Sequence, residues 1–588
     1  MAEPGRMTPT GITRSPASKL EHLYPRVTFR VMSLASRVVE RMFHLPPPVT
    51  RAVRVRRGIV VRARDGIALR TDLWQPRLRP APTILTRTPY GRRGVIGLVS
   101  GRVLAERGFH VVLQSCRGTF DSGGEFDPMR HERDDGLDTV AWIERQPWFD
   151  GNLFTYGPSY LGYTQWAIAA EAGPALKGML TAVTASAFRD PTYAGGSYSL
   201  DTILNWVSIT HNQGGSLLSF MYRQSRVQAK LRRAFTHLPL SEVDGVVTGK
   251  EIRFFQEWLR HDEPGDPYWD LRGNPDVAQV KAPVCMVGGW YDIFLPWQLR
   301  DYATLRAAGA QPRLVIGPWT HADLGLLGVS MREGIGWFRA ALSGGTTGGA
   351  RIHLGGRDEW RDLPEWPPHT GTTSWFLQPG GDLGPEQPAA SEPDRFRYDP
   401  ADPTPSPGGP LLTREAGRVD NRVVEARSDV LVYTSAPLEA DLELIGPLSA
   451  LVHLRASSAY FDVFVRLCEV EPDGRSENIS EGLVRVTPGM FPPDDGVRAV
   501  EVELWPVGYV FRAGRRIRVQ LAGAAHPKYA RNPGTGEPLG TAARLRPVDF
   551  AVYHDPRHPS ALLLPYAAAA GAGPGVISAR STRTGHSS

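Results

Sequence analysis

Hydrophobic residues in the first part of the chain form short runs of the kind found in strands, separated by stretches with helical spacing. The expected strands cover 53–62, 67–74, 83–86, 111–113 and 152–156, and the expected helices cover 136–146 and 164–172. The short, fully apolar runs are typical of strands buried on both faces of a parallel sheet. Strands that alternate with helices predict βαβ units, and therefore an α/β domain with a mostly parallel sheet.

This pattern changes between about 188 and 279. The segment reads as helical and carries many aromatic residues, and no strand pattern interrupts it convincingly. These aromatic residues are Trp206, Phe220, Tyr222, Phe254, Phe255 and Trp258. The strand pattern then resumes at 284–287 and 314–316. We therefore expect an α/β core in two parts, 51–187 and 280–343, with 188–279 inserted as a helical cap over the active site.

A glycine-rich segment, 344–349, is expected to be a linker. Beyond it the chain is rich in short strands and turns, which favours a sandwich or jelly-roll β domain over 350–566. The expected strands of this domain cover 430–433, 448–454, 462–468, 500–504 and 517–521. The final segment, 567–588, consists mostly of small and polar residues, and we expect it to be a disordered tail.

Residues 1–50 form an N-terminal extension that contains an amphipathic helix. Apolar residues repeat there at helical spacing with arginines along one flank, and three prolines at 46–48 end the pattern. The apolar residues are Val27, Val31, Leu34, Val38 and Met42, and the arginines are Arg30, Arg37 and Arg41. Such a helix can lie on a membrane surface or dock on its own protein. We favour docking.

Length and composition narrow the class of protein. A chain of 588 residues is too long for one core, so two or three domains are expected. The net charge of +6 comes mostly from scattered arginines. No basic stripe is interleaved with aromatic residues, so we expect no nucleic-acid partner. No apolar run is long enough to span a membrane, and no secretory signal is apparent.

The cysteines and acidic residues do not indicate a disulfide framework or a metal site. Three widely spaced cysteines lie in or beside apolar runs, which argues against zinc and for a reducing, cytoplasmic setting. The acidic stretch 121–138 lacks the spacing of a calcium loop. We expect its carboxylates to cap helices and pair with nearby arginines, and we expect neither a metal nor an organic cofactor.

The most informative motif is YGPSYLG at 156–162, which places Ser159 between a strand-like run and an alanine-rich helical run. A serine on a sharp strand-to-helix turn is how α/β-hydrolases expose a nucleophile. The start of the helix adds free N–H groups that can stabilise an oxyanion. The usual motif is G-x-S-x-G, whereas here Leu161 holds the fifth place and Gly162 follows. A G-x-S turn in a structural loop is the alternative.

A serine nucleophile needs a histidine base and a carboxylate, in the chain order Ser, Asp, His for this fold. Asp292 follows the apolar run that begins at Val284, and His321 follows the run that begins at Leu314. Asp292 could instead cap a helix that begins nearby. Tyr90, in the loop after an early strand, is a candidate oxyanion donor, but a packing role is equally plausible for it.

With these residues in view, the chain resembles the cocaine esterase-like acyl hydrolases of the X-Pro dipeptidyl-peptidase superfamily over about 54–566. The motifs that carry the resemblance are RTPY at 87–90, CRG at 116–118, QPW at 146–148, GPSYLG at 157–162, GWYD at 289–292 and GPWTH at 317–321. The resemblance implies an α/β-hydrolase fold with a helical cap and a C-terminal jelly roll. It does not reach the N-terminal extension.

The family's residues fall on named positions of this chain. The resemblance implies a triad of Ser159, Asp292 and His321, and an oxyanion hole formed by the Tyr90 hydroxyl and the Tyr160 N–H. It also implies that Phe294 is an aromatic residue of the acyl pocket.

We therefore predict a serine hydrolase that cleaves carboxylic esters of small molecules through an acyl-enzyme. The alternative is an Xaa-Pro dipeptidyl-peptidase, or an acylase of amino-acid esters or β-lactams, which acts on amides. That alternative needs an acidic group for a substrate amine, for which Asp201, Glu242 and Asp244 are candidates. A third hypothesis is a carbohydrate-binding protein with an inert hydrolase domain. The sequence also allows a homodimer.

Overall fold

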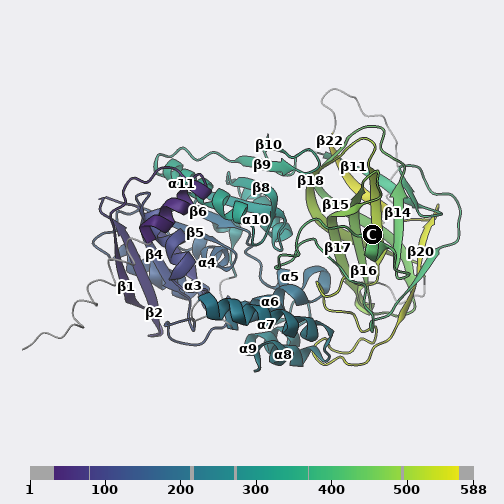
Figure 1. Cartoon of the computed structure of the whole chain (residues 1–588), viewed down its shortest axis with the longest axis horizontal. Helices are drawn as coiled ribbons and strands as arrows, with labels where there is room; N and C mark the ends of the chain where they lie inside the picture. The colour runs from purple at the N-terminus through teal and green to yellow at the C-terminus, as the bar shows by residue number, and fades with distance from the viewer. Residues whose placement is uncertain are drawn as a thin grey trace, which may run out of the picture.

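The structure, a computed structural model, describes residues 32–567 except 79, 212–216, 271–273, 369 and 492–495. It contains two sheets and a helical layer, with the first sheet and the β domain on opposite sides of Figure 1 and the helical segment below them. Residues 1–31 of the predicted extension lie outside the described residues. The predicted tail does too, apart from its first residue.

The first sheet has ten strands in the order β1-β2-β4-β3-β5-β6-β7-β8-β9-β10. From β4 to β9 all neighbours are parallel, and β1, β2 and β10 add antiparallel edges. The strands are β1 Val53–Arg62, β2 Ala68–Pro76, β3 Thr83–Thr88, β4 His110–Ser115, β5 Leu153–Pro158, β6 Leu176–Ala182, β7 Val284–Tyr291, β8 Arg313–Thr320, β9 Gly349–Leu354 and β10 Glu359–Leu363. The predicted mostly parallel sheet is confirmed.

Helices cover both faces of this sheet, because its central strands are apolar on both sides. One core includes side chains of α3 (Glu132–Glu144), α4 (Tyr160–Ala169) and α10 (Leu295–Ala307). The core on the other face includes α11 (Leu324–Leu342) and the π-helix η1 (Gly97–Val103). Central strands such as β7 are buried along their whole length.

In the described part of the segment predicted as a cap, the regular elements are helices joined by loops, with no strand. Its helices are α5 Arg189–Thr192, α6 Leu200–His211, α7 Leu217–Thr236, α8 Val243–Thr248 and α9 Arg253–Arg260. Aromatic residues account for part of this arrangement, since Phe254, Phe255 and Trp258 bury their rings with α6 in a core that also includes Ala530 and Leu539 of the β domain. The side chains of Phe220 and Tyr222 lie outside the described residues. Figure 1 shows this layer spanning the space between the first sheet and the β domain.

The second sheet is mostly antiparallel and encloses one apolar core. Its strands are β11 Thr370–Gln378, β12 Asp382–Gly384, β13 Asp394–Tyr398, β14 Val430–Ser435, β15 Leu442–Ala456, β16 Phe461–Val470, β17 Ser476–Val486, β18 Arg498–Phe511, β19 Arg516–Ala522, β20 Val548–Asp555, β21 His558–Pro559 and β22 Ala561–Ala567. Much of β15 alternates buried and half-exposed positions, as expected for a strand with one face on the core.

The boundary between the two domains differs from the predicted linker at 344–349. Strand β9 begins at Gly349 and pairs in parallel with β8, and β10 then pairs with β9. The first sheet therefore continues to Leu363. The glycines mark the turn at the end of α11, where Gly344 has a φ of 69°, and such a turn produces the same sequence signal as a linker.

The N-terminal helix (32–42) docks on the protein through a different face from the predicted apolar stripe. Met32 and Val39 pack against the core beside α11, and Phe43 is buried directly after the helix. The outward residues Leu34 and Val38 are 66% and 52% exposed. The helical spacing of apolar residues identified the stripe. It did not predict that the opposite face would be attached to the protein by polar contacts of Ser36 and Glu40.

The acidic stretch forms ion pairs with arginines, as expected. Asp135 pairs with Arg117, and Asp121 pairs with Arg92.

Within the described residues, no helix combines the length and the apolar character needed to cross a bilayer.

Candidate active site

Ser159 lies on the sharp turn between β5 and α4. Its backbone has a φ of 56° and a ψ of −129°, a strained conformation that nucleophile turns of this kind require. Glycines make the turn possible: a Cβ on Gly157 would lie 2.4 Å from the Leu161 Cβ, and one on Gly162 would lie 2.2 Å from the Thr184 Cγ2. Gly162 thus permits the close helix packing that the fifth-place glycine of the usual motif would otherwise provide. Leu161 can therefore hold the fifth place.

Three side chains from the ends of β5, β7 and β8 form one hydrogen-bonded chain. The Ser159 Oγ lies 3.0 Å from the His321 Nε2, and the His321 Nδ1 lies 2.6 Å from the Asp292 Oδ2. The parallel strands end at the same edge of the sheet, so residues distant in the sequence converge there. The structure therefore brings together the three predicted triad residues.

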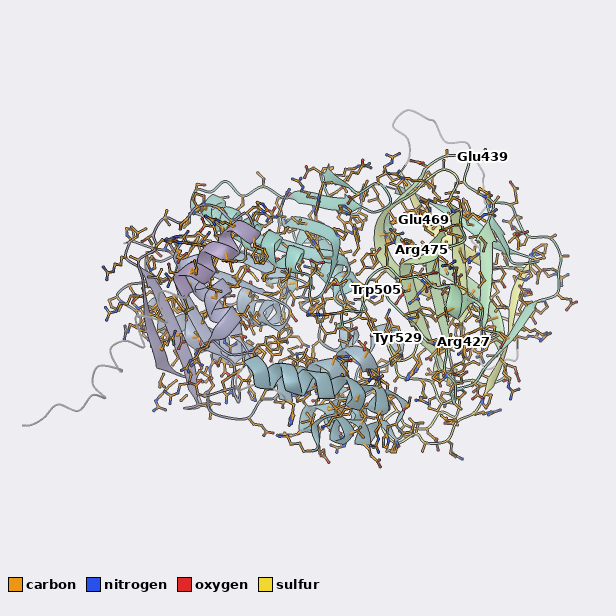
Figure 2. All side chains as sticks on the ribbon, in the orientation of Figure 1. Arg427, Glu439, Glu469, Arg475, Trp505 and Tyr529 are labelled. Carbon is orange, nitrogen blue, oxygen red and sulfur yellow. The ribbon has the colours of Figure 1, made fainter. Side chains whose placement is uncertain are left out.

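Asp292 is fully buried and held from several sides. While its Oδ2 contacts His321, its Oδ1 accepts the Phe294 N–H at 2.9 Å. Phe294 is the N-cap of α10, so Asp292 lies two residues before that position and is not the N-cap that the alternative interpretation proposed. Trp505, on the side of the β domain that faces the hydrolase core (Figure 2), donates its indole N–H to the Asp292 carbonyl at 3.1 Å.

Both predicted oxyanion donors lie beside Ser159. Tyr160 is the first residue of α4, so no carbonyl one turn earlier is available to its N–H. Burial raises the pKa of Tyr90 to about 12, although hydrogen bonds with the side chains of Trp206 and Ser159 lower it in part. At neutral pH the Tyr90 hydroxyl therefore keeps its proton and can donate a hydrogen bond to an oxyanion.

Trp206, on the cap helix α6, connects these two tyrosines. Its indole N–H donates to the Tyr90 hydroxyl at 2.9 Å, and its ring stacks on Tyr160 with 6.0 Å between centroids. Because the Tyr90 oxygen accepts a hydrogen bond from the Trp206 N–H, the Tyr90 O–H points away from Trp206. Tyr160 is fixed in turn by donating its hydroxyl to the Glu132 Oε1 at 2.8 Å. The roles of Trp206 and Glu132 were not predicted, since an aromatic run and an acidic stretch carry no signal of these partners.

A narrow cavity of about 80 Å³ surrounds the Ser159 hydroxyl. Its walls come from the core, the cap and the β domain, which contributes Leu412. Phe294 lines it with its ring 5.6 Å from that of His321, at the position expected for an aromatic of the acyl pocket. The cavity is mostly apolar, as small-molecule sites usually are.

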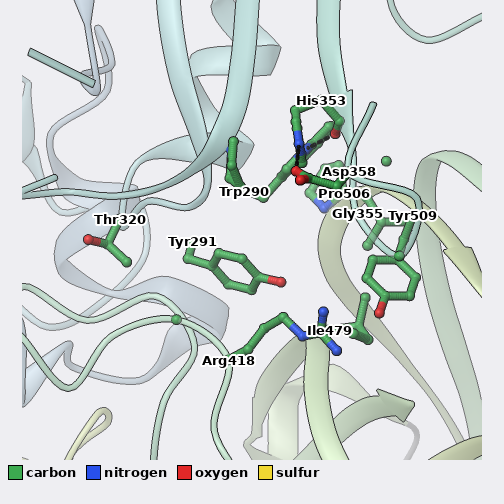
Figure 3. Close-up of a pocket in the computed structure, with 15 residues that line it drawn as sticks. Trp290, Tyr291, Thr320, His353, Gly355, Asp358, Arg418, Ile479, Pro506 and Tyr509 are labelled. Carbon is green, nitrogen blue, oxygen red and sulfur yellow. Dashed lines mark hydrogen bonds and ion pairs between the residues drawn. The ribbon is translucent and has the colours of Figure 1, made fainter. Parts of the chain in front are cut away.

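A larger cavity of about 440 Å³ lies between the first sheet and the β domain (Figure 3). Tyr291 and Thr320, which directly precede the acid and the base, line it, and the Tyr291 hydroxyl points into it. Arg418 across this cavity already pairs with Glu477 at 2.6 Å and with Glu469 at 3.4 Å. None of the triad side chains reaches it, so the smaller cavity is the candidate substrate site.

The acidic residues considered for a substrate amine do not line the candidate substrate site. Asp201 is buried and accepts a hydrogen bond from the Asn205 amide at 3.0 Å. Glu242 lies 2.9 Å from the imidazole of His237, and Asp244 accepts the Ile252 N–H. No Asp or Glu side chain lines the cavity in the part of the chain that the structure describes.

Comparisons with known proteins agree with this architecture. Residues 65–323 match the domain family described as X-Pro dipeptidyl-peptidase (S15 family), and residues 339–563 match the X-Pro dipeptidyl-peptidase C-terminal non-catalytic domain. The chain is 30% identical over 573 residues to the cocaine esterase of Rhodococcus sp. (strain MB1 Bresler), covering 86% of this chain and 98% of the relative.

Two solved structures share the fold. An aminopeptidase from a marine sediment archaeon, Thaumarchaeota archaeon, has a TM-score of 0.74 at 23% identity, covering 87% of this chain and 96% of that one. An alpha-amino acid ester hydrolase has a TM-score of 0.67 at 22% identity, covering 89% and 98%.

Proposed function

The chain belongs to the cocaine esterase-like hydrolases of the X-Pro dipeptidyl-peptidase (S15) family, and we propose that it hydrolyses carboxylic esters through Ser159, His321 and Asp292. The observation that carries this assignment is the hydrogen-bonded chain from the Ser159 Oγ through both ring nitrogens of His321 to the Asp292 Oδ2. The family membership makes the chain a serine hydrolase. The roles of the individual residues are our proposal.

In the acylation step, the Ser159 Oγ attacks the ester carbonyl carbon while the His321 Nε2 takes the serine proton. Asp292 holds the imidazole in the tautomer that leaves Nε2 free to accept, and it stabilises the imidazolium that forms. The carbonyl oxygen becomes an oxyanion that accepts hydrogen bonds from the Tyr90 hydroxyl and the Tyr160 N–H. The tetrahedral intermediate then collapses, and the imidazolium gives its proton to the departing alkoxide.

In the deacylation step, water takes the place of the alcohol. The His321 Nε2 accepts a proton from water as its oxygen attacks the acyl carbon, and the same two donors stabilise the second oxyanion. Collapse returns the proton to the Ser159 Oγ and releases the carboxylic acid. Every proton transfer in the proposed cycle thus passes through the His321 Nε2.

We further propose that the preferred substrates carry short, uncharged acyl groups. The cavity at Ser159 is narrow, and Phe294 and Leu412 give it apolar walls. A dipeptidyl-peptidase or amino-acid acylase would need a carboxylate for the free substrate amine. The positions of Asp201 and Asp244 outside the cavity therefore favour the ester hypothesis over the amide alternative.

A substrate panel on the purified protein tests this proposal. Short-chain nitrophenyl esters are compared with an Xaa-Pro nitroanilide and with an α-amino acid ester, and Ser159→Ala serves as the blank. We expect hydrolysis of the acetyl and butyryl esters that the Ser159→Ala variant lacks. Cleavage of the anilide alone would overturn the ester assignment. The cytoplasmic setting and the homodimer remain predictions.

A further inference from the structure

The N-terminal helix exposes an apolar stripe, which we define as Leu34, Val38 and Met42. The three side chains follow one another at intervals of four residues and are 66%, 52% and 56% exposed. Residues so spaced lie along one line of a helix. Single exposed apolar residues are ordinary, whereas exposed apolar side chains that gather into one patch are a feature of interaction sites. The S15 domain match begins only at residue 65, so this helix lies outside it.

The opposite face of the helix is firmly attached to the protein, so the stripe is held outward. Ser36 is fully buried and donates to the Glu106 Oε1 at 3.0 Å. Glu40 pairs with Arg51, and Arg107 lies 3.6 Å from the same carboxylate. A substitution on the outward face therefore has few contacts to disturb.

The charges beside the stripe are positive. Arg37 and Arg41 each directly precede a stripe residue, are exposed, and form no ion pair with a described residue. The carboxylates on the docked side, Glu40 and Glu106, are already paired with arginines. The outward face therefore combines apolar side chains with guanidinium groups that no carboxylate of the described residues neutralises.

We propose that this face is a docking surface for anionic phospholipid bilayers. A helix with apolar residues in line and arginines beside them inserts its apolar side chains at the headgroup boundary, while the guanidinium groups meet lipid phosphates. A second copy of this chain fits less well, because pairing two such faces would bring the arginines of both copies together. Three side chains also offer far less area than a stable dimer buries, about 800 Å² per partner.

Vesicle flotation with the full chain tests the proposal. The probe is phosphatidylcholine vesicles with and without phosphatidylglycerol, at low and high salt. We expect the protein to float with the anionic vesicles only, and less at high salt because the arginine contribution is screened. The triple variant Leu34→Ser/Val38→Ser/Met42→Ser should weaken binding at least about tenfold, and Arg37→Glu/Arg41→Glu should also weaken it.

Two controls make the result decisive. Val423→Ser/Met490→Ser removes exposed apolar side chains from the β domain, 85% and 50% exposed, and should float like the parent. Ester hydrolysis by the triple variant in the absence of vesicles should equal that of the parent, because no stripe residue lines the cavity at Ser159 or takes part in the triad's hydrogen bonds. Equal flotation of the parent and the triple variant would overturn the proposal. So would a parent that binds no anionic vesicles but forms a dimer that the triple variant loses.

Discussion

The hydrogen bond from Trp206 to Tyr90 gives the sharpest prediction, because it joins a cap residue to an oxyanion donor. Tyr90→Phe removes only the hydroxyl. Loss of one such donor costs about 10²–10³ in kcat, or about 2.7–4 kcal/mol of transition-state stabilisation. Trp206→Phe removes the indole N–H at 2.9 Å from the Tyr90 oxygen and keeps an aromatic ring beside Tyr160. We expect it to cost about 1–1.5 kcal/mol, roughly tenfold in kcat.

If Trp206 acts through Tyr90, these two effects are not additive. In the Tyr90→Phe background there is no hydroxyl left to orient, so adding Trp206→Phe should change kcat by less than about twofold. The assay is kcat and KM for nitrophenyl acetate and butyrate with the parent, both single variants and the double variant. Trp258→Phe is a matched control, since Trp258 stacks on Trp206 and also lines the cavity. Additive effects, or full activity of Tyr90→Phe, would refute the reasoning.

Three further predictions follow from the same contacts. Asp292→Asn should lower kcat by about 10⁴ with little change in KM, because the amide favours the wrong imidazole tautomer, and a fall of less than tenfold would contradict the assigned role. Gly162→Ala should lower the free energy of unfolding by about 1–3 kcal/mol through the clash with Thr184; Thr184→Gly should restore part of it in denaturant titrations, and no rescue would contradict the steric cause. Asp301 accepts hydrogen bonds from Ser186, and burial raises its pKa from 3.8 to about 6. The folded state therefore favours the protonated acid, and the parent loses stability as the pH rises from about 4 to about 6. In Asp301→Asn this loss should be smaller by on the order of 3 kcal/mol, as measured by unfolding at several pH values, and an unchanged pH dependence would contradict it.

Local pattern was enough to predict the α/β layer and the three residues that converge on the site. Ser159, Asp292 and His321 each follow an apolar run, and the ends of parallel strands meet at one edge of a sheet. The placement therefore followed from strand order alone, without any knowledge of side-chain contacts. The fold class is confirmed, and the boundary near 350 differs because a turn after a helix and a linker between domains use the same glycines.

Contacts between distant segments could not be predicted in this way. Trp206 was visible as one aromatic residue among several in the cap, but its hydrogen bond to Tyr90 depends on how the cap sits over the sheet. Leu412 reaches the cavity from the β domain, and no local pattern marks it. In the N-terminal helix, the attached face is held by Ser36 and Glu40, and two of their partners, Glu106 and Arg107, lie far along the chain.

Covalent labelling of Ser159 tests the central claim most directly. A fluorophosphonate should add one phosphonyl group to the parent protein, on the peptide that contains Ser159. The Ser159→Ala variant should take up none and should lose ester hydrolysis, and His321→Ala should be labelled far more slowly. Labelling at another residue, or ester hydrolysis retained by Ser159→Ala, would contradict the account.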